Sequence, residues 1–173
     1  MGKKQLQKFI DELSREELEA QLLDLYTRFK EVKTFYDFSF NPKEDQLLED
    51  ARFKIGKEYF PQNGRKAKMR PSVAQKLIRH YKKLEVNPEI VADIMLYNIE
   101  IAQTYYAEKP IVRRAFFKSM QNSFEEAVEY ISDQGYESSF VDRIQQIIES
   151  FHQQEWPNAK LMSKLAQRTF STN

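Results

Sequence analysis

The chain has 173 residues, no cysteine and a formal net charge of +1 at pH 7. The length suits one ordinary domain, and the lack of cysteine excludes disulfide scaffolds, thiolate-bound zinc, iron–sulfur clusters and thiol catalysis. No apolar run approaches the ~20 residues of a membrane span, and the first residues lack the apolar core of a signal peptide, so we expect a cytoplasmic protein that does not enter a membrane.

The composition favours helices throughout the chain. Four glycines and six prolines leave little material for tight β-turns, while 31% of the residues are charged, and Leu, Glu, Lys and Gln are frequent. We therefore predict an all-α fold. It is a single domain over residues 1–173, a bundle of about eight helices around a central helix at 88–107.

The first helices are predicted from caps and apolar positions. A short helix spans residues 3–13, and Ser14 with Glu17 forms a capping box for a helix over residues 15–33. Four aromatic residues then fall within residues 35–40. We interpret them as a plug that closes one end of the bundle, with an aromatic ligand site as the alternative.

A basic loop separates the next two helices. The first of them covers residues 43–60. Residues 61–70 hold turn residues and four cations with almost nothing to bury, which predicts a mobile surface loop. The helix that starts near Pro71 has its apolar residues on one side, and on the other side it carries Gln75, Lys76, Arg79, His80, Lys82 and Lys83.

The central helix has the widest apolar surface. Asn87 and Pro88 begin it, and its apolar side chains spread over more than half of the helical circumference. Several neighbouring helices must cover such an arc. Asn98 lies inside the arc, where its amide needs hydrogen-bond partners. We expect a satisfied core amide, and a pocket-lining group is the alternative.

Three more helices are predicted after the central one. They cover residues 111–134, 138–154 and 158–169, and residues 171–173 form a frayed tail. Asn41 and Asn87, which both precede a proline at a helix start, are separated by about one HEAT-type repeat of ~40–47 residues. Stacked, HEAT-like helical hairpins are therefore a candidate topology.

Several segments resemble an uncharacterised family of short bacterial proteins. They are residues 24–30, 40–45, 68–76 and 91–105. The function of this family is unknown. The resemblance implies an all-helical, bacterial and cytoplasmic protein. It implies no catalytic residue, cofactor or substrate.

The strongest functional signal is a segregation of charge. Residues 52–83 hold eleven Lys and Arg against Glu58 alone, so the rest of the chain is net acidic. Like charges on one face repel each other, which indicates an anionic partner, either nucleic acid or an acidic protein. The predicted binding residues are Arg65, Lys66, Lys68, Arg70, Lys76, Arg79, Lys82 and Lys83, with Tyr59, Phe60 and His80 as candidates for stacking on bases. The alternative is a solvated face whose cations meet acids of the chain or of a second copy.

Two other classes of function stay open. One is a protein–protein scaffold or homo-oligomer that uses an apolar groove beside the central helix, and the other is an enzyme with a pocket around Tyr97, Asn98 and Glu100. We favour a non-enzymatic protein without a cofactor, because the sequence has no catalytic motif or phosphate-binding loop. Glu149 and His152 have the spacing of half a di-iron site, but the sequence holds no second such pair, so no metal site is predicted.

Overall fold

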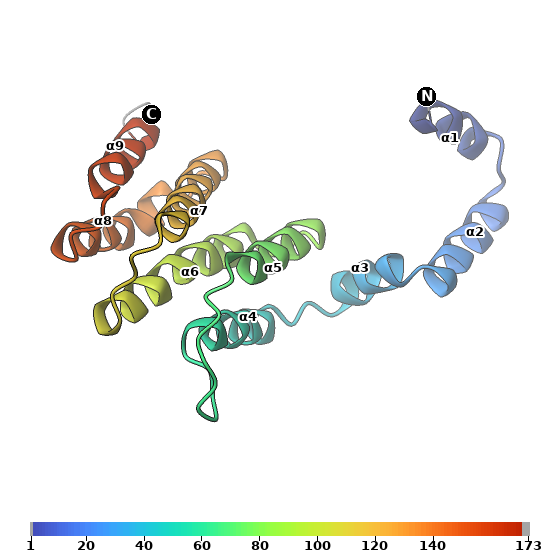
Figure 1. The fold of residues 1–173 in the computed structure, drawn as a ribbon. Coiled ribbons are helices and arrows are strands. Elements are labelled where there is room, and N and C mark those ends of the chain that lie inside the picture. The colour runs from blue at the N-terminus through green and yellow to red at the C-terminus, as the bar shows by residue number, and fades with distance from the viewer. Residues whose placement is uncertain (1, 171–173) are drawn as a thin grey trace. The chain divides into compact units, whose positions relative to one another are not determined.

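The structure, a computed structural model, describes residues 2–170 (Figure 1). Every regular element in this range is a helix, which confirms the all-α prediction, and there are nine helices where about eight were expected. The chain divides between Lys43 and Glu44 into two compact units, which we call the N-terminal and C-terminal units. The single-domain organisation stays a prediction. The tail predicted at 171–173 lies outside the described residues.

The N-terminal unit consists of α1 (Gly2–Asp11), α2 (Arg15–Arg28) and α3 (Lys30–Phe40). The predicted capping box is present: Glu17 N donates to Ser14 Oγ at 3.2 Å, and Ser14 N donates to Glu17 Oε2 at 2.8 Å. Helices α2 and α3 pack against each other. None of the residues described in these three helices is buried.

The helix predicted over residues 15–33 is interrupted. Phe29 has an extended backbone, with φ −113° and ψ 115°, which ends α2 and precedes α3. The aromatic segment at 35–40 therefore forms part of a helix, and the side chain of Phe40 is 78% exposed. This break accounts for the additional helix.

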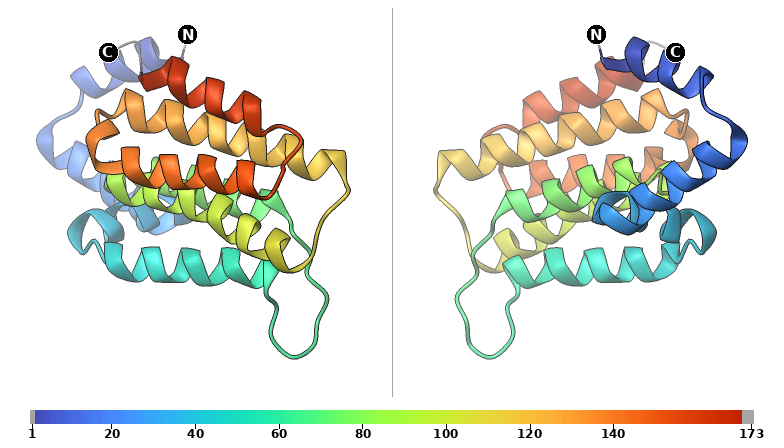
Figure 2. Two further views of the ribbon diagram at one scale, coloured as in Figure 1. Left: turned by 90° about the vertical axis from the view of Figure 1, so that its left-hand side faces the viewer. Right: turned by 90° about the vertical axis from the view of Figure 1, so that its right-hand side faces the viewer.

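The C-terminal unit has six helices, of which α6 is central. They are α4 (Glu44–Tyr59), α5 (Pro71–Lys83), α6 (Pro88–Glu108), α7 (Arg114–Asp133), α8 (Glu137–Gln153) and α9 (Ala159–Phe170). Helix α6 packs against α4, α5, α7 and α8, and α7 packs in turn against α9 (Figure 2). Nine of the 21 residues of α6 are buried. The central helix predicted at 88–107 is thus confirmed.

Side-chain hydrogen bonds hold α6 at both of its ends. Asn87 Oδ1 accepts a hydrogen bond from Glu89 N at 2.9 Å, and Pro88 occupies the first turn. Near the other end, Gln103 Nε2 donates to the carbonyl oxygen of Ile147 in α8 at 2.8 Å. Asn98, between them, is only 2% exposed.

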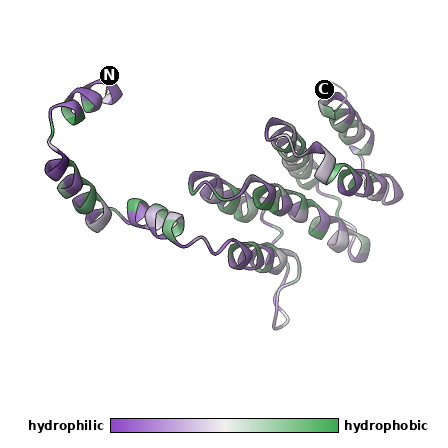
Figure 3. Ribbon diagram, turned by 180° about the vertical axis from the view of Figure 1, so that it is seen from behind, coloured by the Kyte–Doolittle hydropathy of each residue, from purple (hydrophilic) through white to green (hydrophobic). Residues whose placement is uncertain are grey.

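The core of the C-terminal unit is apolar and rich in aromatic rings. Phe151 lies between Phe124 and Trp156, with ring centroids 5.6 Å and 4.8 Å away. Figure 3 shows hydrophobic and hydrophilic residues alternating along the helices, as amphipathic helices require. The contacts run from α4 to α6, α7 and α9 as a stack of helices, and the HEAT-like topology stays a prediction. Among the described helices, none is both long and apolar enough to cross a bilayer.

Candidate functional site

The 61–70 loop leaves the end of α4 and returns to it. Asn63 and Gly64 have φ of 61° and 67° and reverse the chain at the tip of the loop. On the way back, Lys68 N and Met69 N both donate to the carbonyl oxygen of Glu58, each at 2.9 Å. The loop therefore projects from a fixed base, as Figures 1 and 2 show.

A salt bridge closes the base of the loop. Arg70 Nη2 donates to Glu58 Oε1 at 2.7 Å, and Arg70 Nε donates to Glu58 Oε2 at 2.8 Å. Glu58 is only 9% exposed. The hydrogen bond from Arg70 lowers the pKa of Glu58 below its usual range, against the opposing effect of burial. The charge of Arg70, predicted to bind an anionic partner, is thus compensated within the chain.

Three hollows adjoin this loop, as the described residues define them. The largest, which we call the aromatic cavity, has a volume of about 530 Å³ and is lined by Tyr59, Phe60, Pro61, Arg65, Lys66, Ala67, Tyr105 and Lys109. A second hollow of about 250 Å³ lies along the loop itself and includes Lys57, Arg65, Lys66 and Lys68. A third of about 330 Å³ includes Arg52, Lys57, Phe60 and Tyr97. Glu58 is the one acid among the residues that line them in the described chain.

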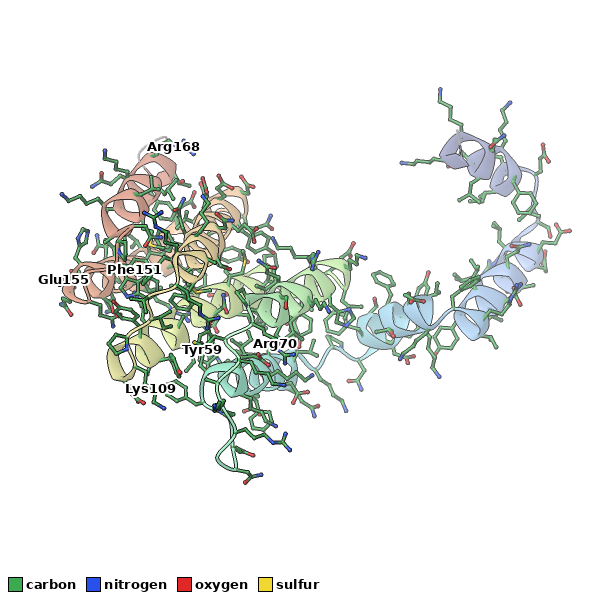
Figure 4. The ribbon with its side chains drawn as sticks, in the orientation of Figure 1. Tyr59, Arg70, Lys109, Phe151, Glu155 and Arg168 are labelled. Carbon is green, nitrogen blue, oxygen red and sulfur yellow. The ribbon has the colours of Figure 1, made fainter. Side chains whose placement is uncertain are left out.

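The aromatic cavity combines ring faces with cations. The rings of Phe60 and Tyr105 meet edge to face with centroids 5.7 Å apart, and Lys109 Nζ lies 5.8 Å from the centroid of Tyr105. Figure 4 labels Tyr59 and Lys109, which come from the ends of α4 and α6. The Tyr59 side chain is 2% exposed, whereas Phe60 is 37% exposed. Burial raises the pKa of Tyr59 well above its usual range, so its phenol stays neutral.

A stripe of cations on α5 is separate from the loop. Lys76, Arg79 and Lys83 recur at helical spacing, and within residues 2–170 no acid lies within salt-bridge distance of them. Arg79 Nε donates to the carbonyl oxygen of Gln75 at 3.2 Å. We call these three residues the α5 stripe.

Two other predicted residues of α5 have different surroundings. Lys82 Nζ lies 3.9 Å from the ring centroid of Tyr130 in α7. Partial burial lowers the pKa of Lys82, although Glu126 and Asp133 act in the opposite direction. His80 is exposed, with its ring centroid 5.8 Å from that of Tyr81. Neither Lys82 nor His80 is among the residues that line the aromatic cavity.

Arg52, at the start of the basic sector, belongs to a network of four charges. Its Nη2 donates to both carboxylate oxygens of Asp93, at 2.7 Å and 2.9 Å. Arg143 Nη1 donates to Asp93 Oδ2 at 2.7 Å, and Arg143 Nε donates to Glu100 Oε1 at 2.6 Å. Desolvation would lower the pKa of Arg143, but these carboxylates outweigh it and raise that pKa. The network joins α4, α6 and α8.

The four-charge network includes Glu100, one of the three α6 residues around which the sequence suggested an enzyme pocket. Glu100 is held by Arg143, and Asn98 is buried. Tyr97 lines the third hollow, where its ring lies 5.6 Å from Arg52 Cζ. The three residues thus have three different surroundings. The salt bridge to Arg143 explains the position of the Glu100 carboxylate without a ligand.

An apolar groove is present, but it lies between α8 and α9. Its volume is about 400 Å³, and its lining includes Val141, Ile148, Ala166 and Phe170. His152, on α8, has its Nε2 2.8 Å from Ser163 Oγ on α9. In the described chain, no three His, Asp or Glu side chains converge as a metal ion would require.

A model described as a family of unknown function (DUF6155) matches residues 1–170. The chain belongs to this family. The match confirms the resemblance drawn from the sequence. No curated protein and no solved structure matches the chain.

Two residues of this DUF6155 chain enter the candidate site without having been predicted there. Tyr105 lies within the central helix predicted at 88–107, and Lys109 lies between that helix and the one predicted at 111–134. Both line the aromatic cavity, because the end of α6 lies beside the end of α4. In the sequence, Pro61 marks this end of α4 and Phe60 is a candidate for stacking, but nothing there indicates which helix end lies opposite it.

Proposed function

We propose that this protein binds single-stranded nucleic acid through the 61–70 loop, the aromatic cavity and the α5 stripe. The observation that carries the proposal is the aromatic cavity, in which Phe60 and Tyr105 lie beside Arg65, Lys66 and Lys109. Cations neutralise phosphates, and aromatic rings stack on bases that are not paired. A binding protein of this kind needs no catalytic residue. Its bacterial origin and cytoplasmic location stay predictions.

The rings favour nucleic acid over an acidic protein. The carboxylates of an acidic protein surface need only cations, whereas this cavity also offers the exposed ring surface of Phe60, on which a base can stack. A duplex hides the faces of its bases in the stack, and a single strand presents them. A single strand therefore uses both features of the site.

The charges that stay unpaired also support the proposal. The loop contributes Arg65, Lys66 and Lys68, and the α5 stripe contributes three more cations. None of these six side chains forms a salt bridge in the part of the chain that the structure describes. By contrast, Arg52 and Arg70 are paired with acids and hold the structure. The two groups of free cations give a strand two points of contact.

The test is binding of a fluorescein-labelled 20-nucleotide single strand, measured by anisotropy at several salt concentrations. The affinity is expected to fall as salt rises, since phosphate contacts release counterions. The triple variant Arg65→Glu, Lys66→Glu, Lys68→Glu is expected to bind at least about tenfold more weakly, as loss of several phosphate contacts implies.

The matched control makes the same change of charge elsewhere. Lys118→Glu, Lys160→Glu and Lys164→Glu alter exposed lysines of α7 and α9 that do not line the loop hollows, and this variant is expected to keep most of the affinity. Equal losses in both triple variants, binding that ignores salt, or binding of polyglutamate in place of the oligonucleotide would overturn the proposal.

Self-association is a second candidate, favoured by the N-terminal unit. Within residues 2–43 no side chain is buried, and Leu6, Leu23, Phe29 and Phe40 are each more than 40% exposed. Apolar surface of this kind often marks a protein interface. Light scattering of the full chain tests it: a mass near twice 20.7 kDa supports a dimer, and a monomer at high concentration excludes one.

A further inference from the structure

We infer that the aromatic cavity takes a single unstacked nucleobase, whose neighbouring phosphates lie on Arg65, Lys66 and Lys109. This inference deepens the proposed function and rests on it. The proposed function requires that a strand binds across the loop, the rings and the α5 stripe as a whole, whereas the inference assigns one position, in the aromatic cavity, where a single base enters the protein. The two can therefore fail separately.

The size of the cavity fits a nucleotide unit. Its volume of about 530 Å³ is within the ~300–1,000 Å³ usual for small-molecule sites. Loop residues form one side of it, and the ends of α4 and α6 form the rest. A base with its sugar fills such a space, while the rest of the strand continues over the loop.

The rings provide a face for the base to lie on. Phe60 and Tyr105 already touch edge to face, with centroids 5.7 Å apart, so a base lies against them and does not insert between them. Tyr59 backs Tyr105 from the interior, with centroids 6.0 Å apart. Because Tyr59 is buried and fixed by its packing, the ring surface is held in place before a ligand arrives.

The cations come from two separate elements. Arg65 and Lys66 belong to the loop, and Lys109 follows the last residue of α6. In a nucleic acid strand each base is flanked by two phosphates. Cations from two separate elements suit such a backbone better than a ligand with one charged group.

The nearest acids do not occupy the cavity. Glu58 is turned to Arg70, which holds both of its carboxylate oxygens. The cations of the cavity have no salt-bridge partner among residues 2–170. The cavity is therefore positively charged as well as ring-lined, which an ordinary packing defect in a helical bundle would not be.

The test separates the base from the backbone. An oligonucleotide of ten adenosines is compared with an oligomer of the same length and charge in which every base is absent. Wild-type protein is expected to bind the oligonucleotide at least about fivefold more tightly, the lower end of what stacking one base on an aromatic side chain contributes. Phe60→Leu and Tyr105→Leu are expected to bring this ratio close to one.

Two further variants guard against a general loss of structure. Phe170→Leu makes the same substitution on α9, outside the cavity, and is expected to keep the wild-type ratio. Phe60→Trp places an indole at the cavity rim, while the native Trp156 is 3% exposed. The fluorescence of the indole introduced at position 60 is expected to be quenched by the oligonucleotide and not by the baseless oligomer.

Each outcome has a defined meaning. A ratio near one in wild-type protein overturns both the inference and the base stacking on which the proposed function relies. An unchanged ratio in both leucine variants overturns the inference alone. Failure to bind either oligomer overturns both. A ratio that collapses in Phe60→Leu and Tyr105→Leu but not in Phe170→Leu supports the assignment of the base to this cavity.

Discussion

Arg70 donates two hydrogen bonds to the carboxylate of Glu58, from Nη2 to Oε1 at 2.7 Å and from Nε to Oε2 at 2.8 Å. The carbonyl oxygen of the same glutamate accepts from Lys68 N and Met69 N. One residue at the end of α4 therefore fixes the returning arm of the 61–70 loop through both its side chain and its backbone. The cations at the tip of the loop project from this fixed base.

Removal of this carboxylate is expected to loosen the loop. Glu58→Gln loses a charge-assisted, two-pronged interaction, so the unfolding free energy is expected to fall by about 1–2 kcal/mol, reduced from the ~1.5–3 kcal/mol of such bonds by the exposure of Arg70. Hydrogen exchange of the Lys68 and Met69 amides is expected to accelerate. The control Glu49→Gln, at an exposed position of α4, is expected to change neither. Unchanged exchange in Glu58→Gln would contradict the role of the pair.

The same pair predicts a dependence on pH. Arg70 lowers the pKa of Glu58 below its ordinary value of 4.5, so the contribution of the ionised carboxylate is present above pH 4.5 and is lost as the pH falls through the lowered pKa. The difference in unfolding free energy between wild type and Glu58→Gln is therefore expected to be constant near neutral pH and to shrink below pH 4.5. Urea titrations at several pH values measure it. A difference in unfolding free energy that grows on acidification would contradict this prediction.

The loop was predictable from sequence, but its anchor was not. Residues 61–70 hold turn residues and nothing to bury, which is a local signal. The contact between Glu58 and Arg70 depends on the path of the chain between them. From the sequence, the cations of 52–83 were also predicted to act as one group. In the fold, Arg52 and Arg70 form salt bridges with acids, and Lys82 lies over an aromatic ring. Such pairing is decided in three dimensions.

The helices show the same limit. Periodicity predicted the central helix well, since its apolar arc is a property of consecutive residues. The break at Phe29 was missed because no glycine or proline marks it. The cavity was missed because Tyr105 and Lys109 come from a helix end far along the chain from Phe60. Local patterns identify elements, and contacts between distant elements make the site.

The four-charge network is expected to stabilise the C-terminal unit. Arg143→Ala leaves Asp93 with one cation and Glu100 with none. The unfolding free energy is expected to fall by about 2–3 kcal/mol, somewhat less than the ~3–5 kcal/mol of a fully buried pair because these side chains keep some exposure. Urea denaturation measures it.

A surface arginine provides the comparison. Arg79 bonds only to a carbonyl oxygen of its own helix in the described chain, so Arg79→Ala is expected to cost about 0.5 kcal/mol or less. Equal costs for Arg143→Ala and Arg79→Ala would show that the network adds little.

Gly56 and Tyr97 are expected to be coupled. A Cβ on Gly56 would lie 3.2 Å from Tyr97 Oη, and the ring of Tyr97 is placed beside Arg52. Alanine gains about 1 kcal/mol over glycine inside a helix, but this tight contact offsets the gain. Gly56→Ala is therefore expected to be nearly neutral in wild type and stabilising in a Tyr97→Phe background. A double-mutant cycle measures the coupling, and additivity within ~0.3 kcal/mol would contradict it.

Deletion of residues 1–43 is expected to leave the C-terminal unit folded. Every buried residue in the described chain lies at or beyond Ala51, so the deletion removes no core side chain. The thermal midpoint followed by circular dichroism is expected to shift by only a few degrees, whereas a peptide of residues 1–43 is expected to melt without cooperativity, since short helices without a core are marginal in water. Full-length protein is the reference. A deletion variant that aggregates or shows no melting transition would mean that the N-terminal unit contributes to the core.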